Sequence, residues 1–181
     1  MIGNSNNNNF KGKVIWLFGR PCAGKSTIAN QMAEILKTKG YPVITLDGDE
    51  LRATINRDLN FSPADRNENI RRSAEIAGIV ARKGFIVVCS FVTPTNLLRH
   101  LISDVLQDVA FEMIYINTTL DECKRRDTKG QYREAEEGFI KDFTGIGSPF
   151  EEPPESNLRV NTDELKIEEA VEKCLRYVIA K

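Results

Sequence analysis

Short apolar runs along the chain alternate with longer segments whose apolar residues recur every three or four positions. The run 13–18 (KVIWLF) leads into a glycine, which is typical of a buried strand. The segment 25–39 carries its apolar residues on one helical face, and Gly40 follows as a stop signal. The run 85–91 is the most continuous and predicts a central strand buried on both faces. The expected strands are 13–18, 43–46, 85–91, 111–116 and 158–160, and the expected helices are 25–39, 63–83, 97–106, 119–126 and a last one carrying Ile167, Val171, Leu175 and Val178.

This alternation predicts an α/β fold, a parallel sheet of about five strands with helices on both faces. No linker or repeat divides the chain, so residues 13–181 are expected to form a single domain. Residues 1–12 are polar and rich in asparagine, and we expect a disordered tail there rather than a signal peptide. The segment 127–154 is polar and rich in glycine and proline, and it predicts a long mobile excursion.

The charge balance argues against two kinds of partner. The chain has 181 residues, with 25 Lys and Arg against 26 Asp and Glu. A nucleic-acid coat protein or a polybasic membrane binder normally carries a positive excess, so neither is expected. No apolar stretch approaches the roughly 20 residues that span a bilayer. We therefore expect partners that are small molecules.

The four cysteines, Cys22, Cys89, Cys123 and Cys174, lack the spacing of zinc ligands. Cys22 is expected to be a small filler and the other three to lie in the core. His100 is the one histidine and stands in no catalytic motif, so we expect an ordinary residue on a helix surface. Without a recognisable export signal, reduced thiols and a cytoplasmic location are expected.

Residues 19–26 (GRPCAGKS) match the phosphate-loop pattern G-x-x-x-x-G-K-[ST] between an apolar strand and a helix. Such a loop turns backbone N–H groups toward one point beside the positive end of a helix, and so binds polyphosphate. Lys25 would reach the β- and γ-phosphates of ATP, and the Ser26 hydroxyl would ligate Mg²⁺. The expected ATP-binding residues of the loop are Gly19, Cys22, Ala23, Gly24, Lys25, Ser26 and Thr27.

The phosphate loop alone does not distinguish a kinase from a GTPase or a motor ATPase. The chain lacks the Asn-Lys-x-Asp guanine signature and is short for most motor ATPases. A kinase also needs an acceptor site, a group that orients the acceptor hydroxyl, and a lid that excludes water.

An acidic cluster follows the second expected strand, at the edge where open α/β sheets bind ligands. One aspartate of Asp47-Gly48-Asp49 could orient the proton of an attacking hydroxyl, and Asp47 could hold Mg²⁺ through a bound water. The alternative is a helix N-cap with a solvated neighbour.

Further cations lie downstream of this cluster, beginning with Arg52. Arg66, Asn69 and Arg72 recur every three positions, which places them on one helix face. Arginine forks suit phosphate and sulfate oxygens, and Phe61 could stack on a base. The alternative is a solvated charged face with Phe61 in the core.

Four cations surround a helix end and a glycine in the later part of the chain: Arg125, Arg126, Lys129 and Arg133. In a phosphotransferase, a mobile cationic lid at about 126–152 would screen the charge of the triphosphate and exclude water. Arg126 is therefore expected to bind ATP. The alternative is a solvated loop. The apolar stretch 143–151 either packs against a nucleotide or anchors the return of the lid.

The blocks GRPCAGKST, DGDELR, DLNFSPADRNENIRR, SFVTP, RDTKGQY and FTGIGSPFEEP occur in the order found in the adenylylsulfate kinase family. The chain resembles that family from about residue 13 to residue 162. The resemblance implies transfer of the γ-phosphate of ATP to the 3′-hydroxyl of adenosine 5′-phosphosulfate (APS). The product is the activated sulfate donor PAPS. Mg²⁺ would accompany ATP, and the family is often dimeric, so a homodimer is one expectation.

The same resemblance assigns roles to individual side chains. Asp49 should lie near the acceptor hydroxyl, Phe61 should pack on the acceptor adenine, and Lys129 should come from the lid. The expected catalytic residues are Lys25, Asp49 and Lys129. The implied acceptor-binding residues are Asp49, Arg52, Phe61, Arg66, Asn69, Val92, Thr93 and Lys129.

The segment 90–99 departs from the family pattern. Thr93 replaces a serine that some members phosphorylate, and Thr95 and Asn96 stand where an aromatic residue and an arginine usually follow. Because these positions border the acceptor site, one alternative is a kinase of the same fold acting on another nucleotide, such as a nucleoside diphosphate derivative in surface-polysaccharide synthesis. A second alternative is a nucleotide-binding regulator without turnover.

Overall fold

The computed structural model describes residues 11–154 and 158–180. Five parallel strands form one sheet in the order β2-β3-β1-β4-β5. The strands are β1 (Lys13–Phe18), β2 (Val43–Asp47), β3 (Ile86–Phe91), β4 (Ala110–Asn117) and β5 (Leu158–Asn161). The helices are α1 (Lys25–Thr38), α2 (Gly48–Ala53), α3 (Pro63–Arg82), α4 (Asn96–Val105), α5 (Leu120–Arg125), α6 (Gln131–Glu136) and α7 (Ile167–Ile179). The predicted α/β fold with five parallel strands is confirmed.

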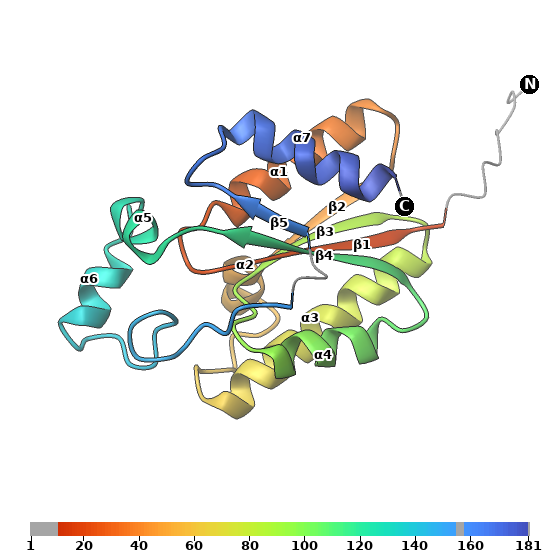
Figure 1. The fold of residues 1–181 in the computed structure, drawn as a ribbon. Helices are drawn as coiled ribbons and strands as arrows, with labels where there is room; N and C mark the ends of the chain where they lie inside the picture. The colour runs from red at the N-terminus through yellow and green to blue at the C-terminus, as the bar shows by residue number, and fades with distance from the viewer. Residues whose placement is uncertain (1–10, 155–157, 181) are drawn as a thin grey trace, which may run out of the picture.

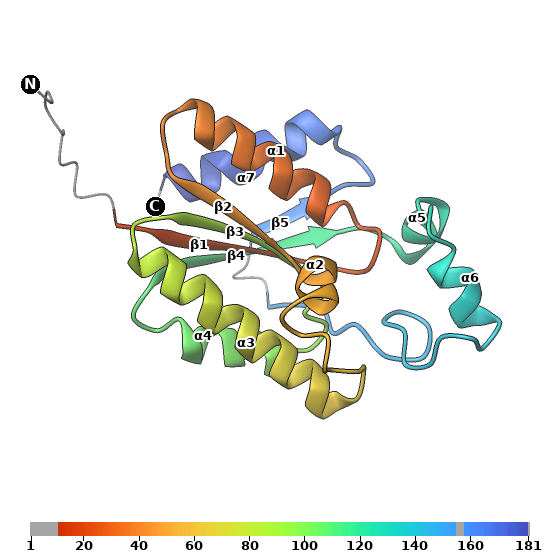
Figure 2. The same ribbon diagram turned by 180° about the vertical axis from the view of Figure 1, so that it is seen from behind.

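Helices cover both faces of the sheet, with α1 and α7 on one face and α3 and α4 on the other (Figures 1 and 2). Alternate residues of β1 supply the two cores, as the pleat of a strand requires. Ile15 and Leu17 pack under α1 and α7, whereas Val14, Trp16 and Phe18 pack under α3 and α4. The strand is therefore buried on both faces, which explains why its sequence is continuously apolar.

The chain leaves the central strand β1 into α1 on one face of the sheet, and it leaves the neighbouring strand β3 into α4 on the other face. The carboxyl end of β1 is therefore the point at which a doubly wound sheet opens a crevice for ligands. Phosphate-loop residues 19–24 lie at this point, between β1 and α1, and the last two, Lys25 and Ser26, begin α1.

Two short helices, α2 and α6, are not among the helices expected from the sequence, although α2 agrees with the alternative that placed a helix N-cap in the acidic cluster. α2 begins directly after β2, because the Asp47 side chain caps it by accepting the Asp49 N–H at 2.9 Å. α6 begins at Gly130, whose φ of 72° is left-handed, and its Tyr132 N–H donates to the Asp127 carboxylate at 2.7 Å. The excursion expected at 127–154 therefore contains ordered local structure.

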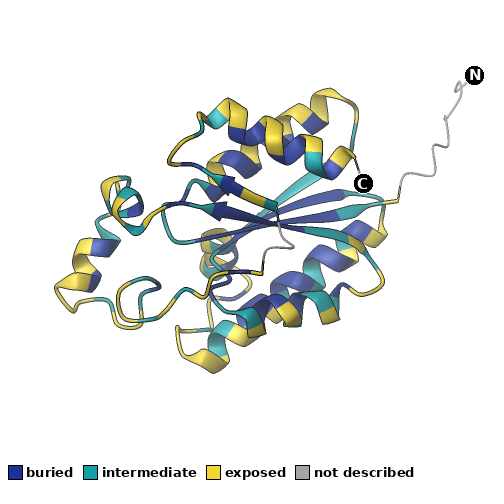
Figure 3. Ribbon diagram, in the orientation of Figure 1, coloured by how far each residue is buried: buried dark blue, intermediate teal, exposed yellow. Residues whose placement is uncertain are grey.

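The central strands are buried, whereas α5, α6 and their loops are mostly partly or fully exposed (Figure 3). The tail expected at 1–12 lies almost wholly outside the described residues. Cys89, Cys123 and Cys174 are buried and His100 is exposed on α4, as expected. Among the described residues, no helix is both long and apolar enough to cross a membrane.

Candidate active site

The phosphate loop is shaped by glycines at its two ends. At Gly19 a Cβ atom would lie 2.4 Å from the carbonyl oxygen of Ile116, so no other residue fits against β4. Gly24 has a φ of 94° and offers no side-chain cap to α1. The first N–H groups of α1 therefore remain available to an anion at the positive end of the helix dipole.

Lys25 lies in the loop with 9% of its surface exposed, and its Nζ donates to the carbonyl oxygen of Arg20 at 2.6 Å. Burial lowers the pKa of Lys25 from 10.5 to about 8. A polyphosphate would supply the negative charge that this buried ammonium lacks in the free protein.

Three oxygen-bearing side chains meet where β1, β2 and β3 end. Ser26 and Ser90 each donate a hydroxyl proton to Oδ2 of Asp47, at 2.6 and 2.7 Å. Burial raises the pKa of Asp47, but these two hydrogen bonds and the backbone N–H groups of Asp49 and Glu50 together bring the pKa below its ordinary value. The carboxylate is therefore ionised, and the Ser26–Asp47 pair presents the oxygen donors that Mg²⁺ prefers.

Arg126 joins the far side of the phosphate loop to β5. Its guanidinium donates to the hydroxyl and the carbonyl oxygen of Thr162 at 3.0 and 2.8 Å and pairs with Glu122 at 2.6 Å. One of its nitrogens lies 4.0 Å from the place where a Cβ on Gly24 would stand. Arg126 is thus fixed beside the loop, where the sequence predicts an ATP contact.

Two arginines flank one exposed aromatic ring on the α2–α3 side of the site. The guanidinium of Arg52 lies 4.4 Å and that of Arg66 lies 5.6 Å from the ring centroid of Phe61. Phe61 is 55% exposed, so the alternative that places it in the core is wrong. Burial lowers the pKa of both guanidiniums, and the neighbouring charge of Arg66 lowers that of Arg52 further.

Neither of these arginines forms an ion pair with a carboxylate within residues 11–154 and 158–180. Arg52 donates to the carbonyl oxygen of Asn60 at 3.0 Å. Arg66 donates to the carbonyl oxygens of Phe61 and Asp142 at 2.9 and 2.6 Å. Two cations beside an exposed ring form a surface that suits an anion carrying an aromatic base.

The excursion between β4 and β5 reaches both parts of the site. Lys129 pairs with Asp49 at 2.8 Å, and Asp142 accepts the Arg66 hydrogen bond described above. The return of this segment is anchored at the sheet: Phe150 stacks on Tyr115 with ring centroids 5.6 Å apart. A hollow of about 470 Å³ lies between the phosphate loop and residues 145–150.

Comparison with known proteins identifies the family of this chain. The sequence model of the adenylylsulphate kinase family matches residues 11–161. The chain belongs to the adenylylsulphate kinase family.

Individual members of the family match most of the chain. An adenylyl-sulfate kinase of Bacillus pumilus (strain SAFR-032) is 42% identical over 96% of this chain and 88% of its own length. The bifunctional enzyme NodQ of Azospirillum brasilense is 45% identical over 82% of this chain, which spans 24% of that longer protein. The Mycobacterium tuberculosis APS kinase CysC, solved in complex with AMPPNP and APS, is 36% identical, with a TM-score of 0.90 over 93% of this chain and 98% of that one.

More distant structures share the fold alone. A sugar kinase from Janibacter sp. HTCC2649 is 18% identical, with a TM-score of 0.63 over 93% of this chain. The fold therefore reaches beyond the adenylylsulphate kinase family.

The remaining predicted acceptor residues of this family member are less exposed. Asn69 is 4% exposed on α3 and accepts a hydrogen bond from the Asn56 side chain at 3.0 Å. The Val92 carbonyl oxygen accepts the Gly19 N–H at 3.3 Å, which ties the loop after β3 to the phosphate loop. Thr93 is 1% exposed, and its hydroxyl accepts the Trp16 indole N–H at 3.0 Å.

Arg72 does not join the two arginines at Phe61, although the spacing places it on the same helix. It is bound instead to Asp58 and Glu68, each at 2.8 Å. The difference arises from neighbouring carboxylates that the periodicity of the cations does not reveal.

Two contributors were missed in the sequence. Ser90 holds Asp47, and its only signal was a place in the SFVTP block. Arg20 lies with its guanidinium 4.8 Å from the Phe150 ring centroid, which joins the phosphate loop to the return of the excursion. Nothing in the sequence indicated that contact.

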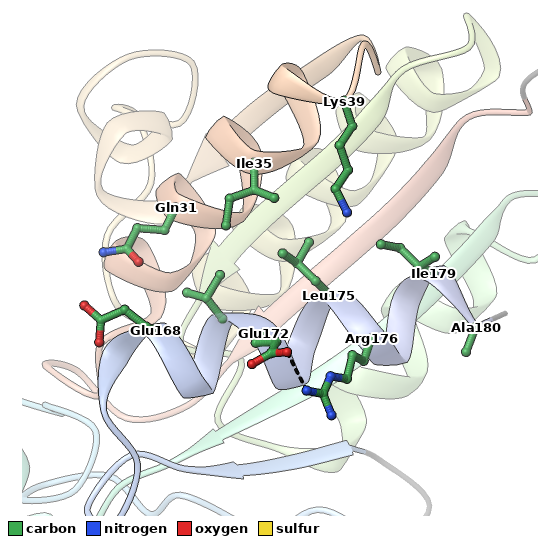
Figure 4. A pocket seen from close by; sticks show the side chains of 10 residues that line it. Gln31, Ile35, Lys39, Glu168, Glu172, Leu175, Arg176, Ile179 and Ala180 are labelled. Atoms are coloured by element: carbon green, nitrogen blue, oxygen red, sulfur yellow. Dashed lines mark hydrogen bonds and ion pairs between the residues drawn. The ribbon is translucent and has the colours of Figure 1, made fainter.

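A larger groove of about 700 Å³ lies elsewhere, between α1 and α7 (Figure 4). Its apolar floor includes Ile35, Leu175 and Ile179, and the Arg176–Glu172 ion pair borders it. None of the predicted site residues lines it. The site is therefore assigned from its charges and hydrogen-bond donors rather than from the size of a cavity.

Proposed function

We propose that this protein transfers the γ-phosphate of ATP to the 3′-hydroxyl of APS and so produces PAPS. The observation that carries the proposal is the Arg52–Phe61–Arg66 cluster beside the phosphate loop. A phosphate loop alone serves many reactions, whereas two arginines without carboxylate partners around an exposed ring suit a second nucleotide with an anionic group. Family membership supports the same assignment.

On the donor side, the loop N–H groups and Lys25 would hold the β- and γ-phosphates, with Cys22, Ala23 and Thr27 completing the loop. Ser26 would ligate Mg²⁺ directly and Asp47 through a water. Bound there, the ion neutralises the charge of the phosphates. Arg126 would contact ATP from the far side of the loop.

On the acceptor side, Asp49 would accept or orient the proton of the 3′-hydroxyl, since it follows β2 at the same edge as the phosphate loop. Phe61 would stack on the adenine, while Arg52 and Arg66 would bind the phosphosulfate oxygens. Asn69 would donate from α3.

The excursion would act as a lid. Its Lys129 is paired with Asp49 in the free protein, so we infer that it turns to the transferring phosphate when both nucleotides are bound. Excluding water then favours transfer to the sugar hydroxyl over hydrolysis.

The decisive experiment is a coupled assay of ADP release with APS, with other nucleotides and without acceptor. We expect release that depends on APS and on Mg²⁺. ADP release with a different nucleotide, and not with APS, would show that the other nucleotide is the acceptor. ATP binding without any acceptor-dependent ADP release would favour a regulator. Each assay uses protein that shows a cooperative melting transition.

The Lys25→Ala variant tests the donor side. Turnover should be lost, because a charge that stabilises the transferring phosphate disappears, while thermal unfolding keeps a single transition. Near-normal turnover in Lys25→Ala would contradict the assignment of the phosphate loop.

Two further expectations, on oligomeric state and location, complete the proposal. A homodimer is tested by light scattering coupled to size-exclusion chromatography. A cytoplasmic location is supported by cysteines that are all free, and cell fractionation would test it.

A further inference from the structure

Two asparagine side chains meet in the interior beside the acceptor site. Asn56, in the turns between α2 and α3, is 0% exposed, and Asn69 on α3 is 4% exposed. The Nδ2 of Asn56 donates to the Oδ1 of Asn69 at 3.0 Å.

The Asn56 amide is only half satisfied. Its Oδ1 is buried and has no hydrogen-bond partner among the described residues. A buried acceptor without a partner destabilises a fold, so such a group needs a reason to be present. The half of the amide that makes a contact is the N–H₂ group, and that contact is to Asn69.

The backbone holds Asn56 in place on both sides. Its N–H donates to the Leu51 carbonyl oxygen at 2.8 Å, and its own carbonyl oxygen accepts the Leu59 N–H at 3.0 Å. The donor offered to Asn69 is therefore fixed in position.

This donor determines which end of the Asn69 amide turns outward. With Oδ1 of Asn69 bound inside, its Nδ2 is left without a protein partner among residues 11–154 and 158–180. That nitrogen is not completely buried, so part of it is accessible to a ligand. Arg66 lies three residues earlier on α3, so its side chain and that of Asn69 are neighbours on the helix.

We propose that Asn56 is a positioning residue, which orients the Asn69 amide so that its N–H₂ group adds a donor to the anion site of Arg52 and Arg66. If the amide turned over, a carbonyl oxygen would face the anion and repel it. Asn56 thereby determines that a hydrogen-bond donor, rather than a carbonyl oxygen, faces the anion, although Asn56 itself does not contact the acceptor. The inference rests on the proposed function, because it assigns the bound anion to APS.

The first test is Asn56→Leu, which keeps a similar volume and removes the donor. We expect the KM for APS to rise about tenfold while the KM for ATP changes by less than about twofold. Ser73→Ala is the matched control, because the Ser73 hydroxyl is equally buried and bonds the backbone carbonyl oxygen of Asn69 at 2.6 Å. This control should lower the melting temperature and leave the KM for APS unchanged.

A double-mutant cycle tests whether Asn56 acts through Asn69. Asn69→Leu should raise the KM for APS, and Asn56→Leu combined with Asn69→Leu should raise it no further. Additive effects would overturn the proposal, as would an unchanged KM for APS in Asn56→Leu or equal losses for both substrates.

If Asn56→Leu does not fold, Asn56→Asp replaces it, since a carboxylate accepts from Asn69 and turns the amide over. A normal KM for APS in that variant would equally overturn the proposal. Wild-type turnover separates the test of the proposed function from the test of Asn56. If APS stimulates no ADP release by the wild-type protein, the proposed function fails. If the wild type responds to APS and the Asn56 variants have a normal KM for APS, only the positioning role fails.

Discussion

Two pairs of arginines lie in or beside α3, and they differ in what neutralises them. Arg71 and Arg72 both donate to Glu68, through nitrogen–oxygen distances of 2.8 Å, and Arg72 also binds Asp58 at 2.8 Å. These hydrogen bonds, with that from Arg71 the largest cause, lower the pKa of Glu68 from 4.5 to about 2. The charges of this pair are satisfied within the folded chain.

Arg52 and Arg66 have no such carboxylate partners in the part of the chain that the structure describes. Their hydrogen bonds go to backbone carbonyl oxygens and to one threonine hydroxyl, and both guanidiniums lie beside the ring of Phe61. Half-burying two cations near one another without a carboxylate is unfavourable in the free protein. A bound anion removes that cost.

The comparison separates arginines whose charges are paired within the fold from arginines that we propose bind the ligand. Cations with carboxylate partners have little further affinity for an anion, since a ligand would first have to displace those partners. Cations held by neutral carbonyl and hydroxyl oxygens keep their charge available for an anion. Sequence spacing cannot make this distinction, because both pairs occur in the same charged stretch of the chain.

Among variants that test this comparison, the largest expected effect is that of Arg66→Ala. It should lower kcat/KM for APS by about 10- to 100-fold, or about 1.5–3 kcal/mol, which is typical of a hydrogen bond to a charged group. The KM for ATP should stay near its wild-type value. Steady-state kinetics with each substrate varied in turn measures both.

Arg66→Lys sharpens the same comparison. It keeps the charge but loses the fork that binds two oxygens, so we expect an intermediate loss. Acceptor kinetics unchanged in both variants would show that Arg66 is a surface charge like its neighbours.

The alternation of apolar runs was sufficient to predict the five strands, because a parallel sheet covered on both faces demands continuous apolar strands. Asp47 shows where the prediction stopped. It is the N-cap that one interpretation required, and its other carboxylate oxygen accepts a hydrogen bond from Ser26. Because the carboxylate has two oxygens, its role as a cap is compatible with the predicted role of holding Mg²⁺ through a water, which stays a prediction.

The partners of individual side chains could not be predicted from the sequence. α6 is a single short helix whose start is fixed by Gly130 and by the hydrogen bond to Asp127. It lies in a polar segment with several cations, where no apolar periodicity indicates a helix. The contact between Asn56 and Asn69 depends on how the turn after α2 folds back onto α3. Such contacts follow from tertiary packing, which the spacing of residues along the sequence does not reveal.

A smaller effect is expected for Arg72→Ala. Loss of the pairs with Asp58 and Glu68 should lower the melting temperature slightly, because exposed ion pairs contribute little to stability. The KM for APS should equal that of the wild type. A rise as large as that in Arg66→Ala would remove the distinction between the two pairs.

The smallest effect is the pH dependence of stability in Glu68→Gln. Since the pKa of Glu68 is about 2 in the folded protein and 4.5 ordinarily, its carboxylate stabilises the fold fully above pH 4.5. That contribution falls as the pH drops through the folded pKa, so wild type and variant should differ in melting temperature near neutral pH and converge toward pH 2. Arg71 and Arg72 keep their charge over this whole range, so convergence reports protonation of Glu68 alone. A constant difference at every pH would mean that Glu68 stabilises the fold by packing of its side chain rather than by its charge.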